Sequence, residues 1–153
     1  MIGRIYYVAV GSQAQTTAKN LIEIASAADS VTLVERAYIK QTSFDTSENL
    51  GVLVQRITTT GTGTAYVPPP AAEGDQAFGG VVETDSSAPP TYTALKELLE
   101  DGFNVLSGWL WTPANDDEAW VISPSALLGI ALDVAPSGAM DFSYGCTLRE
   151  IGG

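Results

Sequence analysis

The chain has 153 residues, a length that suits one ordinary domain with its own core. Eighteen Asp and Glu residues outweigh seven Lys and Arg residues, so the net charge at pH 7 is −11. This negative field repels phosphate backbones and anionic lipid surfaces, which argues against nucleic-acid and membrane partners. The absence of histidine from the sequence removes His-based catalytic triads and Cys/His zinc sites.

Short runs rich in Val, Ile, Thr and Tyr alternate with clusters of Gly, Pro, Ser and Asp. This punctuation is typical of an all-β sandwich or barrel, and it predicts one domain over residues 1–153. The expected strands, in chain order, are Arg4–Val10, Asn20–Ala25, Val31–Thr42, Leu50–Thr59, Phe78–Thr84, Phe103–Thr112, Ala119–Ile122, Ala126–Val134 and Ala139–Ile151.

The third of these strands shows the clearest alternation of apolar and polar residues. Val31, Leu33, Ala37 and Ile39 are expected on one face. Glu35 falls on the same face, so it needs either a partner or a place at a sheet edge. Near the end of the chain, Cys146 lies in a predicted strand, where a lone cysteine is expected to be a small buried hydrophobic residue.

Two segments depart from the strand pattern. Pro68, Pro69 and Pro70 impose an extended polyproline conformation without ladder pairing, so residues 60–73 are expected to form a long surface connection. Together with the first strand, this segment is expected to supply an arm that can add to the sheet edge of a neighbour. Thr91–Asp101 is ambiguous, and the i, i+3, i+4 spacing of its leucines favours a short helix ending at Gly102.

The sequence offers few residues suited to catalysis or to cofactor binding. We therefore expect no enzyme activity and no cofactor. Paired carboxylates such as Glu73 with Asp75, or Glu83 with Asp85, lie in predicted loops or at strand ends, where solvated acids are ordinary. Asp116, Asp117 and Glu118 form a weak candidate for a hard-cation site such as Ca²⁺, although their spacing matches no EF-hand loop.

The sequence leaves three roles open for the three tryptophans. Trp109, Trp111 and Trp120 can pack in the core, anchor a protein interface or line a carbohydrate platform. Because Trp109 and Trp111 share one face of a predicted strand, core packing is favoured over an interface, and an interface over sugar binding. These tryptophans and the three prolines are the candidate protein-interface residues of the sequence.

The order of several segments resembles the small jelly-roll head decoration, or cement, proteins of tailed bacteriophages. The segments are Asn20–Ser43, Leu53–Thr58, a Pro-rich loop, Gly74–Gly80, Phe103–Pro113, Val121–Leu132 and Leu148–Gly153. The resemblance implies a jelly roll of about eight antiparallel strands that forms a homotrimer on the major capsid protein. It also implies a protein made in the host cytoplasm and placed on the outer capsid surface of the virion, with no small-molecule substrate.

Two other functions stay open at this point. One is a carbohydrate- or receptor-binding sandwich of a phage fibre or tail that uses the tryptophans, which requires a row of exposed aromatic rings. The other is an enzyme built on paired carboxylates, which requires two acids about 5–10 Å apart across a cleft. The expected helix at Thr91–Asp101 is an insertion relative to a plain jelly roll.

Overall fold

The computed structural model describes the backbone of residues 3–43, 47–87 and 91–152, and the side chains of all of these except 91–96. In this part of the chain none of the helices has the length and apolar character of a membrane span. Eleven strands and a one-turn 3₁₀ helix (Asp116–Glu118) make up the regular structure of the described residues. The strands are β1 (Arg4–Gln15), β2 (Asn20–Ala25), β3 (Ser30–Gln41), β4 (Asn49–Thr59), β5 (Thr64–Tyr66), β6 (Val81–Thr84), β7 (Thr91–Asn104), β8 (Trp109–Trp111), β9 (Trp120–Ile122), β10 (Leu127–Leu132) and β11 (Met140–Gly152).

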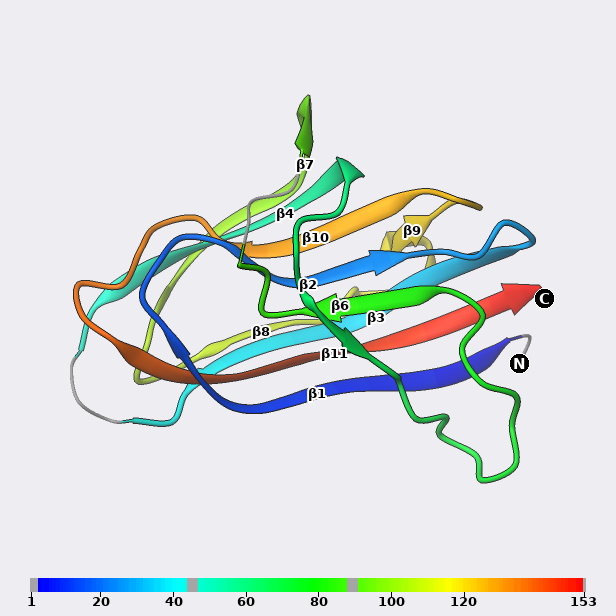
Figure 1. Ribbon diagram of the computed structural model, residues 1–153, viewed down its shortest axis with the longest axis horizontal. Coiled ribbons are helices and arrows are strands. Elements are labelled where there is room, and N and C mark those ends of the chain that lie inside the picture. Colours follow the sequence, from blue (N-terminus) through cyan, green and yellow to red (C-terminus); the bar gives the residue numbers. More distant parts are fainter. Residues whose placement is uncertain (1–2, 44–46, 88–90, 153) are drawn as a thin grey trace.

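The strands form two antiparallel sheets that pack face to face (Figure 1). Sheet A has the order β1-β11-β3-β8, and β9 also pairs with β3. Sheet B has the order β5-β6-β2-β10-β4-β7. The first strand and the last long strand, β1 and β11, lie side by side in sheet A, with Val8 opposite Cys146.

The connectivity is that of a jelly roll. When the short strands β5, β6 and β9 are set aside, eight strands remain in chain order. Sheet A then holds the first, eighth, third and sixth of them, and sheet B holds the second, seventh, fourth and fifth. This arrangement of two Greek keys is the antiparallel jelly-roll sandwich that the sequence predicts. Of the three short strands, β6 and β9 lie within the predicted strands Phe78–Thr84 and Ala119–Ile122, and β5 is an addition that the sequence did not predict.

The core lies between the sheets and is supplied by alternate residues of the strands. Tyr6, Phe142 and Tyr144 from sheet A are fully buried and belong to the same apolar cluster as Ile130 and Val54 of sheet B. Each such side chain contributes roughly 1.5–3 kcal/mol through its removal from water. Cys146 is buried in this core, as expected, and burial raises the pKa of its thiol.

One flank of the sandwich is closed by the proline segment. The Tyr7 N–H donates to the Pro69 carbonyl at 3.1 Å, and the Ala71 N–H donates to the Ile5 carbonyl at 2.7 Å, so the segment pairs with the outer edge of β1. Pro68 is buried. The expectation that the prolines and the first strand form a free arm is therefore wrong. The outer edge of β1 at Ile5 and Tyr7 is paired with this chain's own loop.

The opposite flank is closed by a side-chain hydrogen bond. Trp109 of β8 donates its indole N–H to Asp101 of β7 at 3.1 Å, which joins an edge of sheet A to an edge of sheet B. Trp109 is buried, with 5% of its surface exposed. Both open sides of the sandwich are thus held by specific polar contacts.

The expected alternation of the third strand is wrong in its first half. Thr32 and Val34 are fully buried, whereas Val31 and Leu33 are only half-buried on the outer side. The cause is a bulge in β3, because Thr147 pairs with Arg36 while the next residue of β11 pairs with Val34. The one extra residue shifts the parity of everything before it.

The segment Thr91–Asp101 is a strand and not the expected short helix. It belongs to β7 and pairs along β4, from Thr91 opposite Thr59 to Asn104 opposite Asn49. The edge of β4 presents a long row of backbone groups that need partners, and this need outweighs the helical spacing of the leucines. Leu99 packs on the core, whereas Leu98 is exposed.

The single strand expected over Phe103–Thr112 is divided in two. β7 ends at Asn104 and β8 begins at Trp109. The Ser107 and Gly108 N–H groups both donate to the Asn104 carbonyl, which closes a tight turn. Gly108 has φ of 73°, a backbone conformation that favours glycine.

A polar cluster ties the end of β1 to the start of β2 and to the segment after β6. Asp85 accepts hydrogen bonds from Gln15 at 2.9 Å and forms an ion pair with Lys19 at 2.8 Å. Burial raises the pKa of the Asp85 carboxyl, but the Lys19 and Gln15 hydrogen bonds and the charge of Lys19 outweigh it, so the net pKa is lowered. The carboxylate therefore contributes stability above the carboxyl's unfolded pKa, and that contribution is lost as pH falls through the lower folded value.

We expect Asp85→Asn to lower the free energy of unfolding by about 1 kcal/mol at neutral pH, because the substitution removes the ion pair but leaves a hydrogen-bonding amide. Asn tolerates the φ of 55° at this position. The difference from the native chain should shrink as the pH is lowered below 3.8. Urea unfolding at several pH values measures it, and a difference that stays constant with pH contradicts the assignment.

Candidate protein-binding face

The outer face of sheet A is more apolar than a solvated sheet face needs to be. Tyr7 of β1, Leu110 of β8 and Val121 of β9 are 46%, 57% and 41% exposed. Leu33 lies between Val121 and Arg149, its direct neighbours on β9 and β11. We call the following set the sheet A face: Ile5, Tyr7, Leu33, Arg36, Tyr38, Leu110, Val121, Thr147, Arg149 and Ile151.

Close backbone packing flattens the middle of this face. Tyr38 lies over Gly145 of the neighbouring strand, where an added Cβ would meet the tyrosine hydroxyl at 2.8 Å. Leu110 is the direct neighbour of Tyr38 on the other side. Burial raises the pKa of the Tyr38 hydroxyl, so the phenol stays neutral and available as a hydrogen-bond donor. An aromatic ring beside an exposed leucine on a rigid sheet is the composition that protein interfaces favour.

An ion pair at the β3 bulge holds one corner of the face. Arg149 of β11 contacts Glu35 at 2.6 Å, and both side chains are largely buried, with 16% and 18% exposed. Arg149 also lies 3.8 Å from Asp116 in the connection between β8 and β9. Glu35 thus has the partner that the sequence required. Because the pair is desolvated on a sheet surface, it fixes the arginine in one place.

The two outer faces of the sandwich differ in charge. Arg36, Lys40 and Arg149 lie on the outer side of sheet A with Glu35 and Asp141, and Asp116 faces Arg149, so cations and acids balance there. The outer side of sheet B carries the carboxylates Glu23, Glu83, Glu97 and Glu100. On a chain with a net charge of −11, the sheet A face is the side on which another acidic protein surface meets the least repulsion.

The tryptophans that the sequence singled out lie beneath the face and not on it. Trp109 and Trp120 are buried, as the core-packing interpretation expects, and Trp111 is half-buried against the core. Trp111 and Trp120 stack at 3.5 Å between ring centroids, with 12° between their planes. The stack joins β8 to β9 along the same edge of β3. The three rings do not form an exposed row, so the structure does not support the hypothesis that they bind a carbohydrate.

The acidic triplet, Asp116, Asp117 and Glu118, makes contacts with neighbouring groups of the chain. Asn115 caps the 3₁₀ helix by accepting from the Asp117 N–H, and Glu118 accepts from the Asn115 side chain at 3.2 Å. Asp116 faces Arg149. Within the described ranges, no group of three Asp, Glu or Cys residues has the arrangement of a metal site. The weak cation candidate is therefore not supported as a ligand set.

The carboxylate pairs that the sequence suggested do not form a catalytic cleft. Glu73 and Asp75 are exposed in a loop, and Asp85 is held by Lys19. The acids that do come together are Glu83 and Glu23, which are direct neighbours on β6 and β2. Glu23 is buried and accepts from Asn20, Ser86 and the Gly61 N–H.

Pockets show the same lack of paired acids. One pocket is lined by Gly3, Arg4, Glu150 and Gly152, and its single acid, Glu150, accepts from Ser30 and from the Gly79 N–H. A second pocket, beside Arg56, has no acid in its lining. Neither pocket places two carboxylates across a cleft.

Comparison with known proteins yields no match, whether the chain is compared with protein-family models, curated proteins or solved structures. The surface of this chain is therefore the source of evidence for its function. The residues of the sheet A face were missed in the sequence, although a signal exists. Leu110 lies between two core-facing tryptophans, and Val121 lies between the buried Trp120 and Ile122, so strand parity alone turns both outward.

We expect Arg149→Met to destabilise the chain by roughly 1–3 kcal/mol, because it leaves the Glu35 carboxylate desolvated and unpaired. The double variant Glu35→Gln, Arg149→Met should recover most of that loss. Urea unfolding of the two single variants and the double variant gives the coupling energy. Additive effects would show that the two side chains do not interact.

Proposed function

We propose that the chain is a structural protein of a virus particle, a homotrimeric decoration protein that binds the major capsid protein on the outside of a phage head. The observation that carries the proposal is the sheet A face: a flat, apolar surface with balanced charge on an otherwise acidic jelly roll. The described pockets offer no paired acids, and the tryptophans are used for packing. What the chain presents to its surroundings is therefore a surface for other proteins.

Copies of the chain meet at the sheet A face in this proposal. Each copy carries a charge of −11, so contact through sheet B would bring the carboxylates of β6 and β7 against another acidic surface. Contact through sheet A buries Tyr7, Leu110 and Val121 instead and leaves the acidic faces apart. Burial of these side chains supplies the attraction, at about 25 cal/mol per Å² of apolar surface.

We expect the purified chain to have a mass three times the 16.0 kDa of one copy, measured by size-exclusion chromatography with light scattering. Leu110→Glu should shift the chain to monomer, because it places a charge in the middle of the apolar contact. Val81→Glu is the matched control, because Val81 is also 57% exposed but lies on β6 of sheet B. A native monomer, or equal dissociation by both variants, would contradict the trimer.

The virion role has its own test. An antibody raised against the purified chain is applied to intact phage particles from the source culture and viewed by immunogold electron microscopy. We expect label over the outer surface of the heads. Label restricted to tails or fibres would instead support a receptor-binding role, and unlabelled particles would refute a place on the virion surface.

A further inference from the structure

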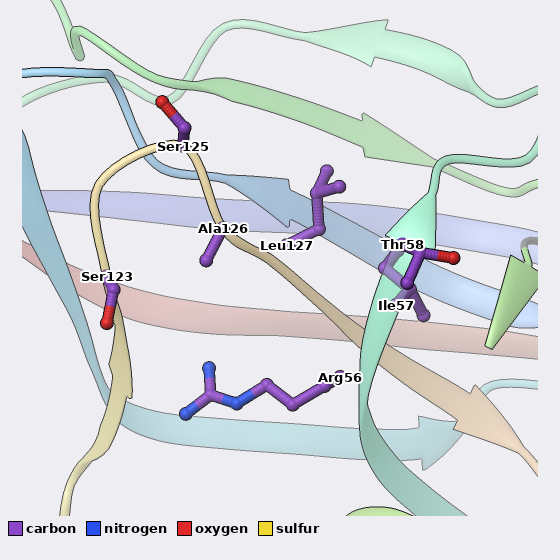
Figure 2. A pocket seen from close by; sticks show the side chains of 7 residues that line it. All are labelled: Arg56, Ile57, Thr58, Ser123, Ser125, Ala126 and Leu127. Carbon is purple, nitrogen blue, oxygen red and sulfur yellow. The ribbon is translucent and has the colours of Figure 1, made fainter. Parts of the chain in front are cut away.

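A pocket of about 430 Å³ opens between the end of β4 and the connection from β9 to β10. Its lining consists of Arg56, Ile57, Thr58, Ser123, Ser125, Ala126 and Leu127 (Figure 2). The volume lies in the range of small-ligand sites and is large enough for an amino-acid-sized group. The pocket is separate from the sheet A face, since β4 and β10 belong to sheet B.

Arg56 is the charged group in this pocket, and its charge is not neutralised from within. In the part of the chain that the structure describes, its guanidinium has neither an ion pair nor a hydrogen bond, and its Nη1 atom is buried without a partner. By contrast, Lys19 and Arg149 are both paired with carboxylates. The chain has eighteen Asp and Glu residues against seven Lys and Arg residues, yet none of the described acids pairs with this arginine.

Burial acts on this guanidinium without compensation. It lowers the pKa of Arg56, and no opposing charge contributes. Arginine nevertheless stays protonated at neutral pH, so a partly desolvated cation remains. Such a group costs stability unless an anion approaches it, because a buried charge needs a partner.

The side chains around Arg56 fit a small anion with an apolar body. Figure 2 shows the Arg56 side chain extending from β4 toward β9, with its guanidinium on the side of Ser123. The Ala126 side chain points to the side on which Arg56 lies, whereas the Ser125 hydroxyl points away from it. The Ala126 methyl group is therefore the apolar contact on the Arg56 side, because Ile57 and Leu127 have the opposite strand parity and Leu127 points away from Arg56 in Figure 2.

We propose that this pocket binds the carboxylate of a ligand with an apolar body, held by the Arg56 guanidinium and the Ser123 hydroxyl. A planar carboxylate matches the fork of arginine N–H donors and can accept two of them at once. A dianionic phosphate fits less well, because one arginine must hold it against the field of a chain with a net charge of −11. The Ala126 methyl group lies on the same side as Arg56 and contacts the group that carries the acid.

The carboxylate can come from a chain end or from an acidic side chain, and two probes separate these sources. N-acetyl-leucine presents a terminal carboxylate beside an apolar side chain, and N-acetyl-glutamic acid α-amide presents a side-chain carboxylate. N-acetyl-leucinamide is the matched neutral control, and inorganic phosphate is the competing anion. Binding is followed on the full chain by two-dimensional amide NMR, with the Arg56 side-chain N–H signal as the local reporter.

We expect at least one of the two carboxylates to cause saturable shifts at Arg56 and Ser123, and the one that binds more tightly identifies the source. Arg56→Met should abolish these shifts, whereas Lys40→Met, at an exposed cation of β3 outside the sheet A face, should leave them unchanged. If neither carboxylate binds, if the leucinamide binds as well as the acid, or if phosphate alone binds, the proposal is wrong.

Stability gives an independent readout. Without a ligand, the Arg56 guanidinium is partly desolvated and unpaired. The Arg56→Met variant should therefore unfold at a urea concentration equal to or higher than that of the native chain. A structural role for the guanidinium predicts the opposite, a clear loss of stability. A lower unfolding midpoint for Arg56→Met would therefore count against a ligand site.

Discussion

Burial of one face of each sheet against the other is the interaction on which the rest of the molecule depends. A sandwich of this kind is open along two flanks, and each flank exposes a strand edge. Here the proline segment pairs with β1 on one flank, and the Trp109–Asp101 hydrogen bond joins β8 to β7 on the other. With both flanks closed, the core is complete within one chain, and the outer faces are free to differ from each other.

Because the outer faces do not have to complete the core, they can carry different kinds of residue. The inner residues of β1, β3 and β11 must be apolar, but strand parity leaves their outer neighbours unconstrained by the core. Sheet B uses its outer positions for carboxylates, and sheet A uses them for Tyr7, Leu110 and a paired Arg149. The proposed role in contact with other proteins needs this asymmetry, because an evenly acidic surface repels both copies and partners.

The sequence predicts the fold class and most strands because the turn residues and the period-two pattern are local signals. It fails where a distant partner decides the outcome. The bulge at Glu35 is specified by the register with β11, and the strand state of residues 91–101 is specified by the open edge of β4. The interface candidates show the same limit. The tryptophans and prolines stand out in the sequence, yet Trp109 and Pro68 are buried where the flanks of the sandwich close. The exposed sheet A face is instead made of residues that the sequence does not single out, such as Tyr7 and Leu110.

The place of β11 between β1 and β3 has a consequence for how the chain acquires its structure. The two strands that flank β11 lie far ahead of it in the sequence, so the centre of sheet A cannot assemble until synthesis has passed residue 140. Until then, β1 and β3 both expose unpaired edges on the ribosome. Pairings of such large sequence separation are slow to form, because loop closure precedes any gain from contact. Addition of the last long strand is thus the step that joins β1 to β3 and completes sheet A.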